Sequence, residues 1–131
     1  MSEEPRNAYE RRRRRGEEEQ RAREEKFWAG LTVLRVLRDD EFEGLPCLPV
    51  DFHVLPHFDG RVEDIAVWLI FATTAESDQV REPAETARYL AHVQVLLRRV
   101  HFPEEGVATL GLYPTSLPEI EAAGGKFHYF R

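Results

Sequence analysis

One short stretch of the chain, DFHVLPHFD, combines the residue types of a metal site. Two imidazoles and two carboxylates are ligands that zinc, iron or nickel accepts. They belong to Asp51, His53, His57 and Asp59. On a strand Asp51 and His53 point to the same face, but His53 and His57 lie about 13 Å apart, too far to share one ion unless the chain bends. The stretch is therefore either a metal centre or the exposed polar part of an edge strand.

A run of five arginines near the beginning of the chain is the second candidate for chemistry. Such a run can neutralise several phosphates of a nucleic acid. It consists of Arg11, Arg12, Arg13, Arg14 and Arg15. Glutamates follow the run after Gly16, and no aromatic residue is interleaved for base stacking. We therefore expect a solvated helix that compensates its own charge, and nucleic-acid binding is the alternative hypothesis.

The chain contains none of the common sequence signatures of an enzyme. The patterns G-x-S-x-G, Walker A, G-x-G-x-x-G and H-E-x-x-H are all absent. Cys47, the single cysteine, has no basic neighbour in the sequence that would lower the pKa of its thiol, so we expect it to be inert. No catalytic residue and no cofactor is predicted, and the sequence favours a protein that is not an enzyme.

Charge is distributed unevenly along the chain. Residues 1–26 carry nine Lys/Arg and eight Asp/Glu, a net charge of +1, whereas residues 27–131 carry nine and sixteen, a net charge of −7. An acidic body repels phosphate backbones and attracts a basic partner. We expect the acidic residues at the ends of the predicted elements to contact a partner protein. These are Asp39, Asp40, Glu41, Glu43, Glu63, Asp64, Glu104 and Glu105.

The first half of the chain must position these residues on a helix and a hairpin. Good helix formers with opposite charges four residues apart predict a helix over residues 17–39. Gly16 weakens this helix, so residues 1–16 are expected to be a mobile charged arm. Alternating apolar residues predict a strand over residues 50–55, and a continuous apolar run predicts a central strand over residues 65–72.

The second half predicts a crossover and a short terminal element. Pro83 and an apolar stripe from Ala87 to Val100 predict a helix, which leads to a strand over residues 107–113 parallel to the central one. The tetrapeptide Ser116 to Glu119 matches a capping box and predicts a short helix that Gly124 and Gly125 close. The aromatic residues 126–131 predict a final edge strand.

Together these elements predict one α/β domain, on the border of α+β, in the order α-β-β-α-β-α-β. The domain covers residues 17–131 and is built on a mixed four-stranded sheet with helices packed on it. A length of 131 residues suffices for one hydrophobic core. The single cysteine, the charged N-terminus and the shortness of every apolar run predict a cytoplasmic protein without a membrane segment.

Three functions compete on these grounds. The leading hypothesis is a cytoplasmic protein-binding module of a regulatory, inhibitor or immunity type, which presents an acidic surface to a partner protein. The second is a metal-dependent hydrolase or nuclease that uses the region of His53 and His57. The third is a nucleic-acid-associated factor that the arginine run tethers. A homodimer through the aromatic end or the N-terminal helix is compatible with all three.

Overall fold

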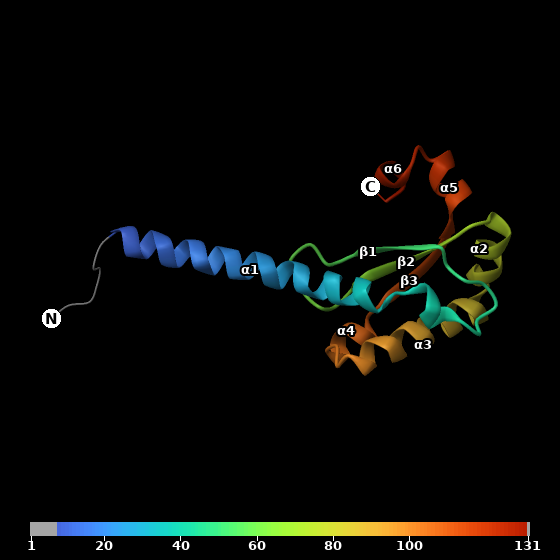
Figure 1. The fold of residues 1–131 in the computed structure, drawn as a ribbon, viewed down its shortest axis with the longest axis horizontal. Coiled ribbons are helices and arrows are strands. Elements are labelled where there is room, and N and C mark those ends of the chain that lie inside the picture. Colours follow the sequence, from blue (N-terminus) through green and yellow to red (C-terminus); the bar gives the residue numbers. More distant parts are fainter. Residues whose placement is uncertain (1–7, 131) are drawn as a thin grey trace.

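A three-stranded sheet with helices packed on it forms the body of the protein (Figure 1). The structure is a computed structural model that describes residues 8–130, without the side chains of residues 19–27. The strands are β1 (Asp51–Leu55), β2 (Ala66–Phe71) and β3 (Gly111–Ser116), in the order β1-β2-β3. β1 is antiparallel to β2, and β2 is parallel to β3. The prediction of a mixed α/β protein is therefore confirmed, but the predicted fourth strand does not occur in the described residues.

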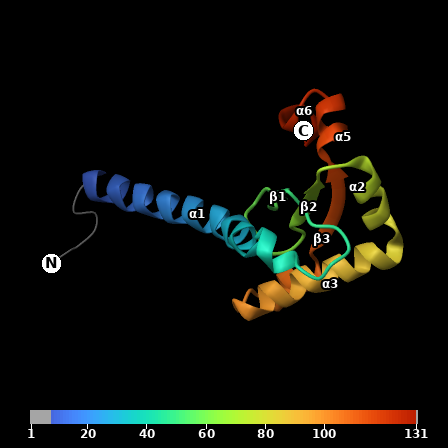
Figure 2. The same ribbon diagram turned by 45° about the vertical axis from the view of Figure 1, so that its right-hand side comes forward.

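The N-terminal helix α1 (Ala8–Val36) begins earlier and ends earlier than the predicted range 17–39. Gly16 lies inside it, in open space, so this glycine costs only conformational entropy and the surrounding helix formers outweigh it. Figures 1 and 2 both show most of α1 projecting away from the sheet. The mobility expected for residues 1–16 stays a prediction, and residues 1–7 lie outside the described part.

The C-terminal end of α1 docks on the body. Ala29 and Val33, together with Leu37 just beyond the helix, are buried, because a spacing of four residues places them on one side. A short 3-10 helix, η1 (Asp39–Phe42), follows and inserts Phe42 into the core. Within residues 8–130, no helix combines the length and the apolar character needed to cross a lipid bilayer.

Between β2 and β3 the chain forms three helices where the sequence predicted one. The predicted helix at Pro83 is confirmed as α3 (Pro83–Arg99). Before it comes α2 (Thr74–Arg81), which was not predicted because its sequence is polar. This helix begins at Thr74 because the Thr73 hydroxyl accepts a hydrogen bond of 3.2 Å from the Glu76 amide. After it comes α4 (Glu104–Ala108), which takes up the start of the predicted strand 107–113, so that β3 begins later.

The C-terminal residues 126–131 were predicted as a strand, and this prediction is wrong. The capping-box helix is confirmed as α5 (Leu117–Ala122), with Ser116 as its N-cap. Gly124 and Gly125 then adopt φ values of +95° and +103°, which reverse the chain, and the next residues form one helical turn, α6 (Lys126–Tyr129). The rings of Tyr129 and Phe130 pack against Trp68 of β2, with centroids 5.7 and 5.3 Å apart. These aromatic residues therefore cover the sheet instead of extending it.

The hydrophobic core lies on one face of the sheet. Side chains that alternate along the strands point to this face, which α1, η1 and α3 cover. They are Phe52, Val54, Val67, Leu69, Phe71 and Leu112. The opposite face carries His53, Trp68 and Tyr113, which lie side by side in the strand register. In Figure 1, α5 and α6 lie on the side of the sheet opposite α3 and α4, so the C-terminal helices cover part of this second face.

Candidate functional site

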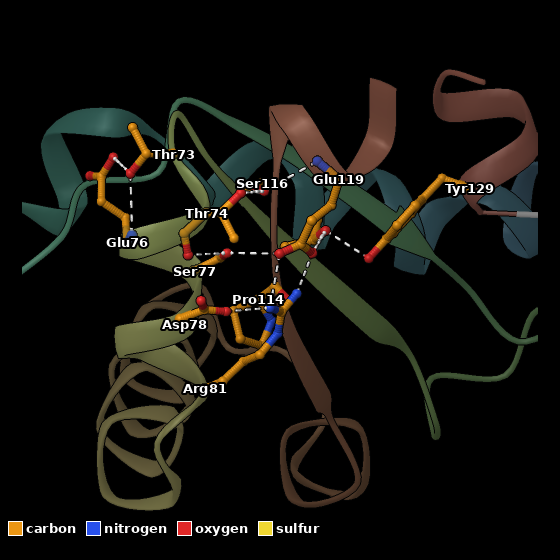
Figure 3. A network of polar contacts seen from close by, with 11 residues as sticks. Thr73, Thr74, Glu76, Ser77, Asp78, Arg81, Pro114, Ser116, Glu119 and Tyr129 are labelled. Carbon is orange, nitrogen blue, oxygen red and sulfur yellow. Dashed lines mark hydrogen bonds and ion pairs between the residues drawn. The ribbon is translucent and has the colours of Figure 1, made fainter. Parts of the chain in front are cut away.

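The densest set of polar side chains lies where the two parallel strands end (Figure 3). β2 leads into α2 and β3 leads into α5, so the beginnings of both helices meet at the same edge of the sheet. The carboxyl ends of parallel strands are a common location for ligand sites in α/β proteins. Here this edge holds five side chains, which we call the Glu119 network: Ser77, Arg81, Thr115, Glu119 and Tyr129.

Glu119 is the centre of this network. Its carboxylate accepts hydrogen bonds from the Arg81 guanidinium at 2.9 Å, the Thr115 hydroxyl at 2.9 Å and the Ser77 hydroxyl at 3.2 Å. The Thr115 and Tyr129 hydroxyls form a further hydrogen bond of 2.7 Å, which ties α6 to β3. The capping box is therefore only half used: the Glu119 amide donates to Ser116, while the Glu119 carboxylate turns to Arg81 on α2.

The charges and hydrogen bonds of the Glu119 network hold neighbouring elements together. The hydrogen bond from Arg81 lowers the pKa of Glu119, and those from Thr115 and Ser77 add to this effect, so the carboxylate is ionised and a poor general base. Ser77 is fully buried and out of reach of a substrate. The network therefore joins α2, β3, α5 and α6, and it offers no activated nucleophile.

The residues of the predicted metal site occupy two separate environments. Asp51 forms an ion pair with Lys126 of α6, and His53 stacks on Phe130 with a ring-centroid distance of 4.0 Å. Burial raises the pKa of Asp51, but the hydrogen bonds from Lys126 and the Phe52 amide outweigh it and the net pKa is lowered. Burial lowers the pKa of His53, and the Lys126 ammonium adds to this effect.

His57 and Asp59 belong instead to the turn that follows β1. The His57 Nδ1 and the Asp59 Oδ1 are 2.6 Å apart, and Arg61 pairs with the same carboxylate at 3.0 Å. Among the side chains that the structure describes, no three from His, Cys, Asp or Glu come together as a metal ion would require. The structure thus brings His57 and Asp59 together in an ion-paired turn, apart from the contacts of Asp51 and His53 with Lys126 and Phe130.

The predicted acidic contact residues separate into two groups. Four of them surround η1: Asp39, Asp40, Glu41 and Glu43. The other four lie where the loop before β2 meets α4: Glu63, Asp64, Glu104 and Glu105. Arg38 pairs with Asp40, Arg99 with Glu41 and Arg98 with Glu104, so several of these carboxylates are compensated within the chain. Asp39 is exposed, and no ion pair of its carboxylate occurs within residues 8–130.

The arginine run lies on the projecting part of α1. All five of its side chains are exposed, and Arg13 pairs with Glu17 at 3.3 Å. The helical rise of 1.5 Å per residue places Arg15 about 20 Å from Trp28, where α1 contacts the body by stacking on Phe102. The arginines are therefore set apart from the acidic body in space as well as in sequence.

A groove between α1 and β1 is the feature that sequence reasoning missed. It has a volume of about 360 Å³. Seven residues line this α1–β1 groove: Gly30, Leu31, Leu34, Phe52, His53, Val54 and Pro56. Leu31 and Leu34 remain 50% and 44% exposed where they line this groove. The groove is apolar and open, as an interaction surface is.

Two further hollows adjoin this groove along the same strand. One shares Phe52 with it, has a volume of about 500 Å³ and carries charged residues from the η1 region. We call it the adjoining hollow, and it is lined by Leu37, Arg38, Asp39, Asp40, Val50, Asp51 and Phe52. The other shares His53 and lies beside Lys126, Phe127 and Phe130 of the C-terminal region. Together these hollows follow β1 from Val50 to Pro56.

The comparisons with known proteins add no relative of this chain. No protein-family model matches it, and neither the search of curated proteins nor the search of solved structures gave a match. The geometry of its own residues is therefore the basis on which a function is inferred.

Proposed function

We propose that this protein is a non-enzymatic protein-binding module of a regulatory or inhibitor type, and that the α1–β1 groove is its contact surface. The observation that carries the proposal is the groove itself, with Leu31 and Leu34 about half exposed beside an edge strand. Exposed apolar side chains that gather in a concave surface mark contact sites, because covering them removes apolar area from water. Neighbouring leucines one helical turn apart give a partner a continuous surface.

The acidic residues enter this proposal at one end of the groove. Asp39 and Asp40 line the adjoining hollow, which shares Phe52 with the groove. Charged groups at the edge of an apolar contact steer the partner and select it more than they strengthen binding. The expected partner therefore offers an apolar segment with a basic group at one end.

The environments of the Glu119 carboxylate and the Cys47 thiol support a binding role over catalysis. Glu119 is engaged by Arg81, and the thiol of Cys47 is buried, with a pKa that burial raises. A buried thiol with a raised pKa is a weak nucleophile. With one cysteine no disulfide forms within these 131 residues, so the proposal places the protein in the reducing cytoplasm.

A matched pair of variants tests this function. Leu31→Glu with Leu34→Glu puts two charges into the groove, whereas Val95→Glu with Val100→Glu adds the same charges at positions that are 44% and 47% exposed in and just after α3. We expect a native lysate to yield a protein that the wild type and the α3 pair retain and the groove pair loses. Retention that the groove pair does not change would remove the proposal, as would turnover of an ester or phosphodiester that a single substitution abolishes.

A second candidate function, polyanion binding by the arginine run, has one observation in its favour. The separation of about 20 Å between Arg15 and Trp28 is more than twice the Debye length of about 8 Å at physiological salt. The negative charge of the body is therefore largely screened at the arginines, which weakens the objection that an acidic protein repels nucleic acid. Local glutamates such as Glu17 still compensate part of the run.

Salt titration of the full chain with a labelled duplex distinguishes this second candidate. Five phosphate contacts predict a slope of about −4.5 in a plot of log affinity against log salt. A variant in which Arg11 to Arg15 are all glutamine should then lose binding. A flat salt response, or binding that the glutamine variant keeps, would reject the candidate.

A further inference from the structure

We propose that the occupant of the α1–β1 groove is an extended apolar segment of a partner protein, which adds to the outer edge of β1 as a fourth strand. This inference rests on the proposed function and names the kind of partner. Its basis is the juxtaposition of an open strand edge, an apolar wall on α1 and an acidic hollow at one end.

The first step is the orientation of the β1 backbone. β1 is an edge strand, paired only with β2 in the described sheet. The Phe52 amide donates to the Asp51 carboxylate at 2.8 Å, so it points away from β2. The two-residue period of a strand gives the Val54 amide and carbonyl the same outward direction. No hydrogen bond outside the β1–β2 pairing involves Val54 within residues 8–130. An extended backbone placed there would satisfy both groups.

The ends of the open edge limit how long the added strand can be. At one end the Val50 amide donates to the Ile70 carbonyl at 2.8 Å, although Asp51 is the register partner of Ile70. Two residues thus face one, which is a bulge that ends regular pairing. At the other end Pro56 has no amide to donate. A partner strand therefore has a short ladder centred on Val54, and side-chain contacts must supply much of its affinity.

The second step is the wall of the groove. Phe52, His53 and Val54 are consecutive, and consecutive residues of a strand line a hollow together only along its edge. Leu31 and Leu34 face this edge from α1. A strand added about 4.8 Å beyond the outer edge of β1 would lie beside Leu31 and Leu34, so its side chains on that face would meet the leucines. A helical partner could bury the leucines, but its backbone could not bond to Val54.

The third step is the charge at one end. The adjoining hollow carries Asp39 and Asp40 beside the beginning of β1. Arg38 compensates Asp40, whereas the exposed Asp39 has no ion pair within the described residues. A lysine or arginine at the corresponding end of the segment is complementary to Asp39. The expected occupant alternates apolar residues over a few positions and carries a basic residue at one end.

Selection from a random peptide display library against the full chain tests this inference. We expect enriched peptides with alternating apolar residues and a terminal lysine or arginine. With the synthetic form of an enriched peptide, exchange of the Val54 amide should slow roughly tenfold or more, because a bonded amide exchanges only after opening. Absence of enrichment, a peptide that binds as a helix, or unchanged exchange at Val54 would overturn the inference.

Methylation of the peptide backbone tests the ladder without altering the protein. N-methylation at the amides that pair with β1 should weaken binding about tenfold or more, and methylation at the intervening amides should not. The protein variants Leu31→Glu and Val95→Glu give the matching comparison, with binding lost only in the first. Equal sensitivity to both methylation patterns would contradict strand addition.

The outcomes separate this inference from the function on which it rests. If the groove variants lose a captured partner protein while no extended peptide binds, the protein-binding function stands and strand addition fails. If sedimentation shows that the chain associates with itself through β1, a second copy occupies the edge and the inference is wrong. If neither partner nor peptide depends on Leu31 and Leu34, both proposals fail.

Discussion

The Glu119 network and the α1–β1 groove lie on the same small sheet but use their side chains in contrasting ways. In the network, residues from α2, β3, α5 and α6 satisfy one another, and Ser77 and Thr115 are fully buried. In the groove, Leu31 and Leu34 remain about half exposed beside a backbone edge that no strand covers. The comparison teaches that the polar side chains of the network are satisfied within the molecule, whereas the apolar side chains of the groove are not fully buried by it.

The largest effect on stability is expected from a substitution of Glu119. Glu119→Gln removes the negative charge to which Arg81 and two hydroxyls donate hydrogen bonds. We expect this substitution to lower the free energy of unfolding by about 2–3 kcal/mol. Urea unfolding followed by circular dichroism measures this loss. Glu121→Gln is the matched control, because Glu121 is exposed on the same helix and should change stability by less than about 0.5 kcal/mol. Equal effects of the two substitutions would contradict the assigned role of the network.

Acid should weaken the same region. The pKa of Glu119 is lowered from its ordinary value of 4.5 in the folded state, so its contribution is fully present above 4.5 and disappears as the pH falls through the folded pKa. The wild type should therefore lose stability on acidification more steeply than Glu119→Gln. Unfolding midpoints measured for both proteins across this pH range test the difference, which isolates Glu119 from the other carboxylates. Parallel pH profiles would show that the network does not hold an ionised Glu119.

Substitutions in the α1–β1 groove should change the stability of the protein far less than Glu119→Gln does. Leu31→Glu with Leu34→Glu should change the free energy of unfolding by no more than about 0.5 kcal/mol per site, because both side chains are already largely in water. The same pair should reduce the fluorescence of a hydrophobic dye bound to the folded protein, since the apolar surface is gone. A destabilisation as large as that of Glu119→Gln would mean that the leucines belong to the core and would remove the contrast.

At the projecting part of α1 the expected effect is local and does not reach the body of the protein. Gly16→Ala should stabilise the helix locally by about 1 kcal/mol, because an added Cβ meets open space and alanine restricts the unfolded chain. Far-ultraviolet circular dichroism at rising temperature should show helicity lost later at this end. The urea midpoint of the body should not move, because residues 8–18 are all exposed. A shift of that midpoint would indicate that the projecting helix packs on the body.

Much of the fold could be predicted where the signal is local. The apolar stripe of α3, the continuous apolar run of β2 and the capping box of α5 are confirmed. Each of these sequence signals lies within a single helix or strand, where residue periodicity and capping act directly on the backbone. α2 was missed because a polar surface helix has no stripe to recognise, although Thr73 offered a capping signal.

The candidate site could be predicted only in part. The sequence marked the exposed charges around η1 and on the arginine run, but it proposed a joint site for Asp51, His53, His57 and Asp59 that the structure divides between α6 contacts and a turn. It gave no indication that Arg81 would bind Glu119, because the two residues are 38 positions apart. The groove was missed for a related reason, since exposure of Leu31 depends on where β1 passes α1.

By itself the sequence determined the charge division of the chain, the helical nature of its first third, the hydrophobic central strand and the capped helix near its end. These follow from residue type and spacing, which act over a few neighbouring residues. The tertiary structure alone decided that Tyr129 and Phe130 cover Trp68 instead of lying in a strand, and that an edge of β1 in the described sheet stays open beside two exposed leucines. Burial is a competition among distant segments for the same surface, and that competition has no local signature in the chain.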